Sequence, residues 1–560
     1  MGFLDWIVLS ATVLFIVGYG AWKTRQNSTL QSYLLGDKEA NWFTVALSIM
    51  ATQASAITFL SAPGQAYTDG MRFVQFYFGL PLAMVVLSMF VVPLYHRLNV
   101  YTAYEFLEKR FDLKTRLLTA FLFLTQRGLA AGFTIFAPSL ILSSILDWDI
   151  YLTNLLTGLL VVVYTVSGGT RAVNVTQKQQ MAVIFIGMLI AGVLVVQYLP
   201  DGVSFINALQ LAGKMGKLNL VDFEFDWNTR YNLWSGLIGG FFLSMSYFGT
   251  DQSQVQRYLS GSSITQSRLG LLFNGMLKIP MQFLILFIGA MVYVFYLFFQ
   301  APLFFNTSLL AQTKNSANSS EIQLIESEYT QVYQKRKQNA LDLSSAFNQK
   351  DEEAIQIHTQ ALKETEAKIQ TLRKQTIELI KKNNKEADTN DTNYIFLNFV
   401  RDYLPSGLVG LLIAVIIFAS MSSTSAELNA LASTTVVDFY KRIWKPQAND
   451  LECVRMSKWM TFFWGVYAIV FAMFANRLGT LIEAVNILGS LVYGTILGIF
   501  LNAFFLKKVT ANATFMAALI AEVIILYCYF FTKIPFLWYN PIGCLAVMGL
   551  GILIQSFYKK

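Results

Sequence analysis

The sequence is poor in the residues that build most metal centres and covalent catalytic sites. Its 560 residues include three cysteines and two histidines. Cys453, Cys528 and Cys544 lie in or beside apolar segments, and their spacing is not that of a disulfide framework. His96 and His358 are far apart, whereas haem, di-iron and histidine-ligated zinc sites need clustered imidazoles. Since no Ser-His or Cys-His constellation is evident either, we do not expect an enzyme.

Charge is also scarce, and it is unevenly spread. Charged residues make up 14% of the chain and hydrophobic residues 55%, whereas a soluble protein is about 25% charged. Twelve of the 42 basic and thirteen of the 34 acidic residues fall between residues 314 and 391. The remainder is apolar enough for a polytopic membrane protein with one polar insert. The net charge of +8 does not indicate a nucleic-acid partner, because the Lys and Arg residues fall in short loops between apolar segments.

Long apolar stretches predict an all-α protein that crosses the bilayer thirteen times, since one spanning helix needs about 20 apolar residues. The predicted spans are 3–22, 41–66, 74–95, 117–145, 150–168, 178–199, 231–259, 267–299, 404–438, 454–475, 479–505, 510–531 and 537–557. The positive-inside rule assigns the loops rich in Lys and Arg, such as 97–116 and 441–455, to the cytoplasm. The N-terminus is then outside and the C-terminus inside, with the loop 200–230 and the insert outside.

The polar insert, residues 303–398, predicts a pair of amphipathic helices. It contains no Gly or Pro, and Ile355, Leu362 and Ile369 repeat at intervals of seven. The chain should reverse near residues 348–351. The simplest interpretation is a solvated helical hairpin on an external loop that tolerates insertion, with no protein partner required. An arm that binds a partner is the alternative.

Two spans carry small and polar residues at mid-membrane. These are the segment ATQASAIT, from Ala51 to Thr58, and the segment SMSYFGTDQ, from Ser244 to Gln252. Such residues favour unwound backbone, whose free carbonyls and amides can bind an ion and a substrate. Interruptions at matching positions of two inverted halves are typical of the binding site of a secondary transporter. The alternative is close helix packing through small residues.

The span 404–438 adds a third polar element. Ala419, Ser422 and Ser423 are spaced i, i+3 and i+4, so they share one helical face. Two hydroxyls and a carbonyl from this face, with carbonyls from the unwound segment in 41–66, would form a site of five oxygens. Oxygen ligands without a carboxylate suit a monovalent cation better than calcium or magnesium. Alternatively, the serines bond to their own helix backbone.

At these positions the chain resembles the sodium:solute symporter family, which includes the sodium/glucose, sodium/iodide, sodium/proline and sodium/sialic-acid cotransporters. The resemblance extends from the first span to residue 505 and excludes the insert. It rests on SIMATQASAITFLSAPGQAY, YTAYEFLEKRF, VYTVSGGTRAV and FASMSSTSAELNA, supported by TDQSQVQRYLS. One departure is Thr170, where the family usually has a larger apolar residue.

The resemblance implies a leucine-transporter-type fold in a plasma or inner membrane. Two inverted repeats of five helices, 41–199 and 231–505, would form its core. The implied regions are 1–40 with the first span and first cytoplasmic loop, 41–199 as the first repeat, 200–230 as an external loop, 231–302 as the start of the second repeat, 303–398 as the insert, 399–505 as the end of the second repeat, and 506–560 with the last two spans.

The resemblance also implies the sodium ligands. They are the carbonyls of Ala51, Ala54 and Ala419 and the hydroxyls of Ser422 and Ser423. Family members with a second sodium use an aspartate and a further hydroxyl, and the matching positions here are Gln177 and Ala426. We therefore expect Na⁺ as the coupling ion, with one ion per cycle.

The family's substrate pocket lies beside the two interruptions. The matching residues here are Gln53, Ser55, Thr58, Tyr77, Ser244, Tyr247, Phe248 and Asn486. Tyr247 corresponds to the family's gating aromatic. Lys278 matches a lysine that contacts sugar in the sodium/galactose branch.

Two basic residues are predicted near mid-membrane, because a rise of 1.5 Å per residue places Arg127 and Lys278 about 15 and about 17 Å into their spans. A basic side chain there costs at least about 2.5 kcal/mol, so it should face a cavity or a partner. A guanidinium offers a bidentate fit to a carboxylate. Alternatively, Lys278 pairs with Asp251 or Glu427, and Arg127 tethers unwound backbone carbonyls.

The sequence therefore predicts a sodium-driven symporter that imports a small organic solute by alternating access. Arg127 favours a carboxylate, of the sialic acid or monocarboxylic acid type, over a neutral sugar or polyol. A membrane sensor built on a transporter core is an alternative of another class. Such sensors carry a signalling domain after the last span, whereas this sequence ends shortly after residue 557.

Overall fold

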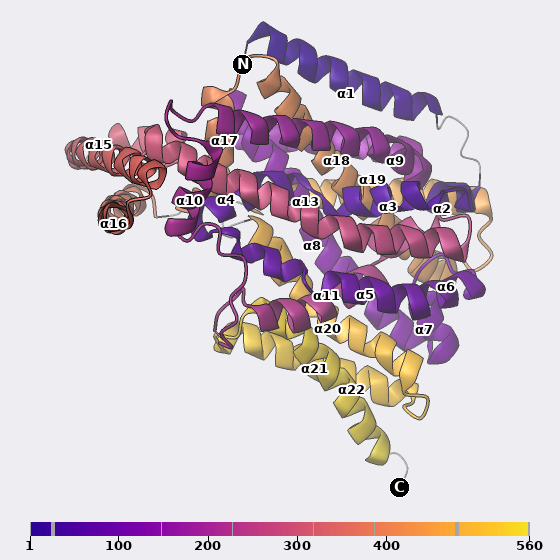
Figure 1. Ribbon diagram of the computed structural model, residues 1–560. Coiled ribbons are helices and arrows are strands. Elements are labelled where there is room, and N and C mark those ends of the chain that lie inside the picture. The colour runs from indigo at the N-terminus through magenta and orange to yellow at the C-terminus, as the bar shows by residue number, and fades with distance from the viewer. Residues whose placement is uncertain are drawn as a thin grey trace.

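The computed structural model describes residues 2–23, 29–146, 148–226, 228–316, 318–385, 387–475 and 481–557. These residues fold into a helical bundle, from one end of which a helical hairpin projects (Figure 1). In the described residues, eight helical segments are long and apolar enough to cross a membrane, or nine if a sharply bent pair counts as one span. The chain is therefore a multi-pass membrane protein.

Most helices follow one another with short connections, although residues 215–239 separate α10 from α11. In chain order they are α1 (Phe3–Lys23), α2 (Leu30–Leu35), α3 (Trp42–Gln53), α4 (Ala56–Asp69), α5 (Leu80–Val86), α6 (Val92–Leu98), α7 (Glu105–Arg110), α8 (Leu113–Leu146), α9 (Ile150–Gln197), α10 (Phe205–Lys214), α11 (Gly240–Gly249), α12 (Gln252–Leu259), α13 (Ile264–Phe298), α14 (Thr307–Lys314), α15 (Ser319–Gln349), α16 (Glu352–Asn383), α17 (Thr392–Tyr403), α18 (Leu408–Thr434), α19 (Asp450–Ala472), α20 (Leu481–Phe505), α21 (Ala511–Phe531) and α22 (Tyr539–Phe557).

Most predicted spans coincide with one helix or with two consecutive helices. The predicted spans 150–168 and 178–199 are instead one helical run, α9, with a kink at Gly169. Gly169 has φ 57° and ψ −162°, and a Cβ there would lie 2.8 Å from the carbonyl oxygen of Tyr33. The kink therefore requires glycine. The predicted start of span 479–505 lies outside the described residues, and α20 begins at Leu481.

Both predicted interruptions are present. The helix α3 ends at Gln53 and α4 begins at Ala56, and the two axes differ by 61°. Likewise α11 ends at Gly249 and α12 begins at Gln252. The second break is closed by the protein itself, because the hydroxyls of Tyr95 and Tyr104 donate to the carbonyls of Gly249 and Thr250, at 2.9 and 3.0 Å. The carbonyls of Gly249 and Thr250 are therefore hydrogen-bonded within the protein and need no ion to satisfy them.

The insert forms the predicted helical hairpin from α15 and α16. Lys350 adopts a left-handed conformation at the turn, and Asp351 caps α16 by accepting from the Ala354 backbone N–H at 3.0 Å. The hairpin has a small apolar core of its own, which includes Ile369 and Leu372. The hairpin also contacts the bundle, because α15 packs against the end of α13 (Figure 1).

The three cysteines belong to the interior of the bundle. Cys453, Cys528 and Cys544 are buried, and each is a free thiol. They lie on α19, α21 and α22, and they therefore contribute apolar packing rather than a covalent framework.

Candidate functional site

A cavity lies beside the break between α3 and α4. Its walls come from that break, from the segment Met71–Tyr77 and from α8, α11, α18 and α20. Its volume is about 750 Å³, part of which is open to solvent. Seven of the predicted substrate-binding residues line it: Gln53, Ser55, Thr58, Tyr77, Arg127, Tyr247 and Asn486. The predicted sodium ligand Ser423 lines it as well. The break thus brings residues from distant parts of the sequence to one cavity.

The cavity wall contains polar atoms that the protein leaves unsatisfied. Among the described residues, no group donates a hydrogen bond to the side-chain oxygens of Gln53 and Gln126, although both atoms are buried. Buried polar atoms are nearly always hydrogen-bonded to protein or to an ordered molecule. The two amides are therefore placed to accept hydrogen bonds from water or from a bound solute.

Three predicted substrate-binding residues do not line the cavity. Ser244 and Phe248 are buried on α11, and the Phe248 ring packs edge-on against Tyr247, with ring centroids 4.9 Å apart. Lys278 is fully buried on α13, and its Nζ lies 5.4 Å from the centroid of the Tyr77 ring. No hydrogen-bond acceptor for Lys278 Nζ is present in the described part of the chain. Tyr77 therefore links Lys278 to the cavity.

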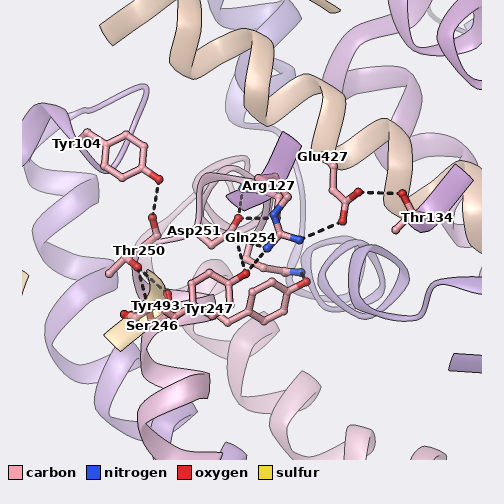
Figure 2. A network of polar contacts seen from close by, with 11 residues as sticks. Tyr104, Arg127, Thr134, Ser246, Tyr247, Thr250, Asp251, Gln254, Glu427 and Tyr493 are labelled. Carbon is pink, nitrogen blue, oxygen red and sulfur yellow. Dashed lines mark hydrogen bonds and ion pairs between the residues drawn. The ribbon is translucent and has the colours of Figure 1, made fainter. Parts of the chain in front are cut away.

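Arg127 is the centre of a buried network of charges (Figure 2). Its guanidinium donates to Asp251 and to the hydroxyl of Tyr493, and it donates to Glu427 at 3.1 Å. Tyr493 also donates to Asp251, at 2.8 Å. We call Arg127, Asp251, Glu427 and Tyr493 the charged cluster. It joins α8, the second break, α18 and α20.

The partners of Arg127 and Lys278 in the structure differ from those predicted from the sequence. Asp251 and Glu427, the carboxylates that the sequence offered to Lys278, contact Arg127 instead. Arg127 is held by these side chains rather than by unwound backbone carbonyls, and its guanidinium lies 5.4 Å from the Tyr247 ring centroid. Glu427 and Tyr493, which also line the cavity, are not among the substrate-binding residues predicted from the sequence. The available signal for Glu427 was a carboxylate within an apolar span, which is costly and functional by default.

The predicted sodium ligands lie on α18 and at the end of α3. The Ala54 backbone N–H donates to the Met50 carbonyl at 2.7 Å and closes the last turn of α3. The carbonyls after Met50, beginning with that of Ala51, are the ones that a helix end leaves without an intrahelical donor. The amide of Gln177, on α9, donates both to the Ser422 carbonyl and to the Thr52 hydroxyl, each at 3.3 Å. Gln177 therefore connects the first break to the polar face of α18.

The two serines of α18 donate their hydroxyl protons within the protein. The Ser423 hydroxyl is within donating distance of the carbonyls of Ala419 at 3.0 Å and Ser420 at 3.2 Å, as the back-bonded alternative expects. Ser422 donates to the side-chain oxygen of Gln180. A hydroxyl that donates its proton keeps two lone pairs, so back-bonding is compatible with binding a cation.

Comparison with known proteins identifies the family. The model of the sodium:solute symporter family matches residues 33–328 and 375–521, so the uncovered internal stretch lies within the polar insert. The bovine sodium-coupled monocarboxylate transporter 2 is 29% identical over 273 residues, which are 48% of this chain and 44% of that protein. The rabbit sodium-dependent multivitamin transporter is 25% identical over 90% of this chain and 66% of its own length. The chain thus spans about half to two thirds of these two relatives.

A bacterial relative and a solved structure match over nearly the whole chain. The sodium/sialic acid symporter NanT of Aliivibrio fischeri is 22% identical over 100% of this chain and 94% of its own length. The structure of a Na⁺-coupled sialic acid symporter, in a substrate-bound outward-open state, has a TM-score of 0.75 at 21% identity and covers 99% of this chain and 98% of that chain. The two proteins share a fold. With the family model matching most of its length, this chain belongs to the sodium:solute symporter family of transmembrane transporters.

Proposed function

We propose that the protein is a sodium-coupled secondary active symporter of the plasma or inner membrane. It imports a small organic solute by alternating access, and the solute bears a carboxylate of the sialic acid or monocarboxylate type. Membership of the family supports the sodium coupling. The relatives named for monocarboxylates and for sialic acid support the solute class.

The observation that carries the solute class is a guanidinium in the wall of the cavity. Arg127 lines the cavity, and its Nε donates to no group among the described residues. A carboxylate that reaches Arg127 would gain a charge-assisted hydrogen bond in a site of low dielectric. Gln53, Ser55 and Thr58 lie in the same cavity and can bond the remaining polar atoms of the solute.

One sodium ion per cycle is proposed at the carbonyls of Ala51, Ala54 and Ala419 and the hydroxyls of Ser422 and Ser423. An ion there would join the first break to α18 and so stabilise the outward-open arrangement beside the solute. Gln177 stands where relatives with a second sodium have an aspartate. Its side-chain amide group donates to Thr52 and Ser422, and amide hydrogens do not attract a cation.

A neutral sugar or polyol is the second candidate solute. It is favoured by the charged cluster, because Arg127 already contacts two carboxylates. The amide and hydroxyl groups of Gln53, Ser55 and Asn486 would then bind the hydroxyls of the sugar.

Uptake by the purified protein in liposomes tests the proposal. Labelled sialic acid, lactate and glucose are compared with and without an inward sodium gradient. The proposal expects accumulation of a carboxylate only when the gradient is present. Uptake of glucose alone would reject the carboxylate class, and uptake that ignores the sodium gradient would reject sodium coupling.

A further inference from the structure

The charged cluster contains one more negative charge than positive charge when both carboxylates are ionised. Arg127 faces Asp251 and Glu427, and the exposed fractions of the three side chains are 3%, 0% and 5%. An uncompensated charge is costly in a medium of low dielectric. A sodium ion at the proposed site would restore neutrality. A solute carboxylate would then add a negative charge again.

Asp251 and Glu427 differ in the number of hydrogen bonds that they accept. Asp251 accepts from Arg127, from Tyr493 at 2.8 Å, and from the backbone and hydroxyl of Ser253 at 2.8 and 2.6 Å. Glu427 accepts from Arg127 at 3.1 Å and from Thr134 at 3.0 Å. Glu427 also lines the cavity, whereas Asp251 does not. Glu427 is therefore the carboxylate that an arriving anion can displace from Arg127.

Thr134 provides a place for a proton on Glu427. Its hydroxyl is within donating distance of two acceptors, Glu427 at 3.0 Å and the Ala131 carbonyl at 2.8 Å. A hydroxyl has one proton and two lone pairs, so it donates to only one of them at a time. Thr424 donates to Thr134 at 2.9 Å. If Thr134 donates to Ala131, its remaining lone pair can accept a hydrogen bond from protonated Glu427.

Of the titratable side chains around Glu427 in the described residues, only Arg127 is hydrogen-bonded to its carboxylate. The groups that face it are Arg127 of α8, Asp251 at the start of α12, Tyr247 of α11 and Tyr493 of α20. The helices α3, α4 and α9 contribute the neutral side chains of Thr52, Thr58, Gln177 and Gln180 near this part of α18. The proton therefore comes from water in the cavity.

We propose that Glu427 is a proton acceptor that is coupled to anion binding. In the cavity without solute, ionised Glu427 accepts from Arg127. When a solute carboxylate takes its place, one proton from solution forms an O–H bond on Glu427, whose charge falls from −1 to zero, and no bond of the solute is broken. This inference rests on the proposed function and adds to it that the transporter selects for a carboxylate by exchanging it for its own.

Proton uptake on binding tests this exchange directly. Sialic acid and lactate are titrated calorimetrically into the full-length protein with sodium present, in two buffers of different ionisation enthalpy. We expect the wild type to take up close to one proton per bound carboxylate near neutral pH. Its affinity should fall about tenfold per pH unit above neutrality, as expected for one linked proton. Glu427→Gln should still bind the carboxylate, with no proton uptake and no pH dependence.

Control variants separate this role from a general effect of removing a membrane carboxylate. Glu522→Gln removes a carboxylate from α21, outside the cavity, and should leave proton uptake as in the wild type. Thr134→Val keeps Glu427 but removes the acceptor for its proton, so it should reduce the uptake. Should Glu427→Gln fail to fold, the wild-type proton count and Thr134→Val provide the test.

The outcomes distinguish this inference from the proposed function. Carboxylate binding by the wild type without proton uptake overturns the inference and leaves the function intact. Equal proton uptake by wild type and Glu427→Gln also overturns it. If glucose binds and no carboxylate does, at any pH, both the function and the inference are rejected.

Discussion

Buried arginines occur both in the charged cluster and in the hairpin, and the two regions balance them differently. In the hairpin, Arg336 pairs with Glu366 at 2.9 Å and donates to the Tyr296 carbonyl at 2.7 Å. Arg373 donates to both oxygens of Asp391 at 2.8 Å. Each hairpin arginine therefore has one carboxylate. Arg127 has two.

The difference supports a structural role for the hairpin arginines and the proposed binding role for Arg127, since Arg127 lines the cavity and the hairpin arginines do not. Burial raises the pKa of Glu366, but neighbouring Arg336 outweighs burial, so the net pKa lies below the ordinary value. A balanced pair that is also bonded to a backbone carbonyl holds α15, α16 and α13 together. The Nε of Arg336, like that of Arg127, has no partner among the described residues, but Arg336 does not line the cavity beside the first break. In the charged cluster, Arg127, Glu427 and Tyr493 line the cavity, and the proposed mechanism exchanges Glu427 for a solute carboxylate.

The largest expected effect is the loss of a balanced pair. Arg336→Met leaves Glu366 without its partner, and breaking a buried pair costs about 3–5 kcal/mol of stability. Solute uptake per folded molecule should be unchanged. Thermal unfolding and uptake, measured on the same preparation, check both statements.

The stability difference between Arg336→Met and the wild type should depend on pH. Because the pKa of Glu366 is lowered in the folded protein, its pair stabilises above the ordinary pKa of 4.5, and this stabilisation is lost as pH falls through the folded pKa. The difference between Arg336→Met and wild type should therefore shrink in acid. A difference that stays constant down to pH 3 would contradict the pairing.

The next largest effect is expected in the charged cluster. Arg127→Lys keeps the positive charge but cannot reproduce the planar fork that meets Asp251, Glu427 and a solute carboxylate. Loss of one charge-assisted hydrogen bond, about 1.5–3 kcal/mol, predicts a fall in uptake of about 10- to 100-fold. Sodium binding should persist, because the proposed sodium ligands are on other helices. Loss of folding together with uptake would show that Arg127 is structural, like Arg336.

A smaller effect is expected at the proposed sodium site. Ser423→Ala removes one neutral ligand of five, which at about 1 kcal/mol raises the sodium concentration for half-maximal uptake roughly fivefold. Ser420→Ala, on the same helix and outside the proposed site, is the matched control. A Hill coefficient for sodium clearly above one would indicate a second sodium near Gln177.

The smallest expected effect on transport is in a test that concerns only the orientation of the protein in the membrane. Single cysteines at Glu353 and Lys445, both exposed in the structure, report the two sides of the membrane. The distribution of basic residues predicts that an impermeant thiol reagent added outside labels Glu353→Cys and not Lys445→Cys. Labelling in the reverse sense would invert the proposed orientation.

The sequence predicted the features that depend on local composition. The breaks at Ala54–Ser55 and Thr250–Asp251 follow from small and polar residues in apolar spans, and the hairpin follows from its seven-residue repeat. It did not predict the pairing of Arg127 with Glu427 and Tyr493, which are 300 and 366 positions away in the chain. Helix periodicity specifies which residues share a face, but not which faces meet across a bundle. The number of spans was likewise obscured at α9, because helical geometry continues on both sides of Gly169.

Because all three thiols are buried, spectroscopic labels can be attached to introduced cysteines without first removing the native ones. Cys453 and Cys544 have no exposed surface and Cys528 has 8%, so a reagent confined to water should find the native protein almost inert. A spin label or fluorophore on the hairpin, paired with one on the loop after α18, would then report distance changes in otherwise unaltered protein. Such distances would test the proposed alternating access as the solute, the sodium ion and the proton are added separately.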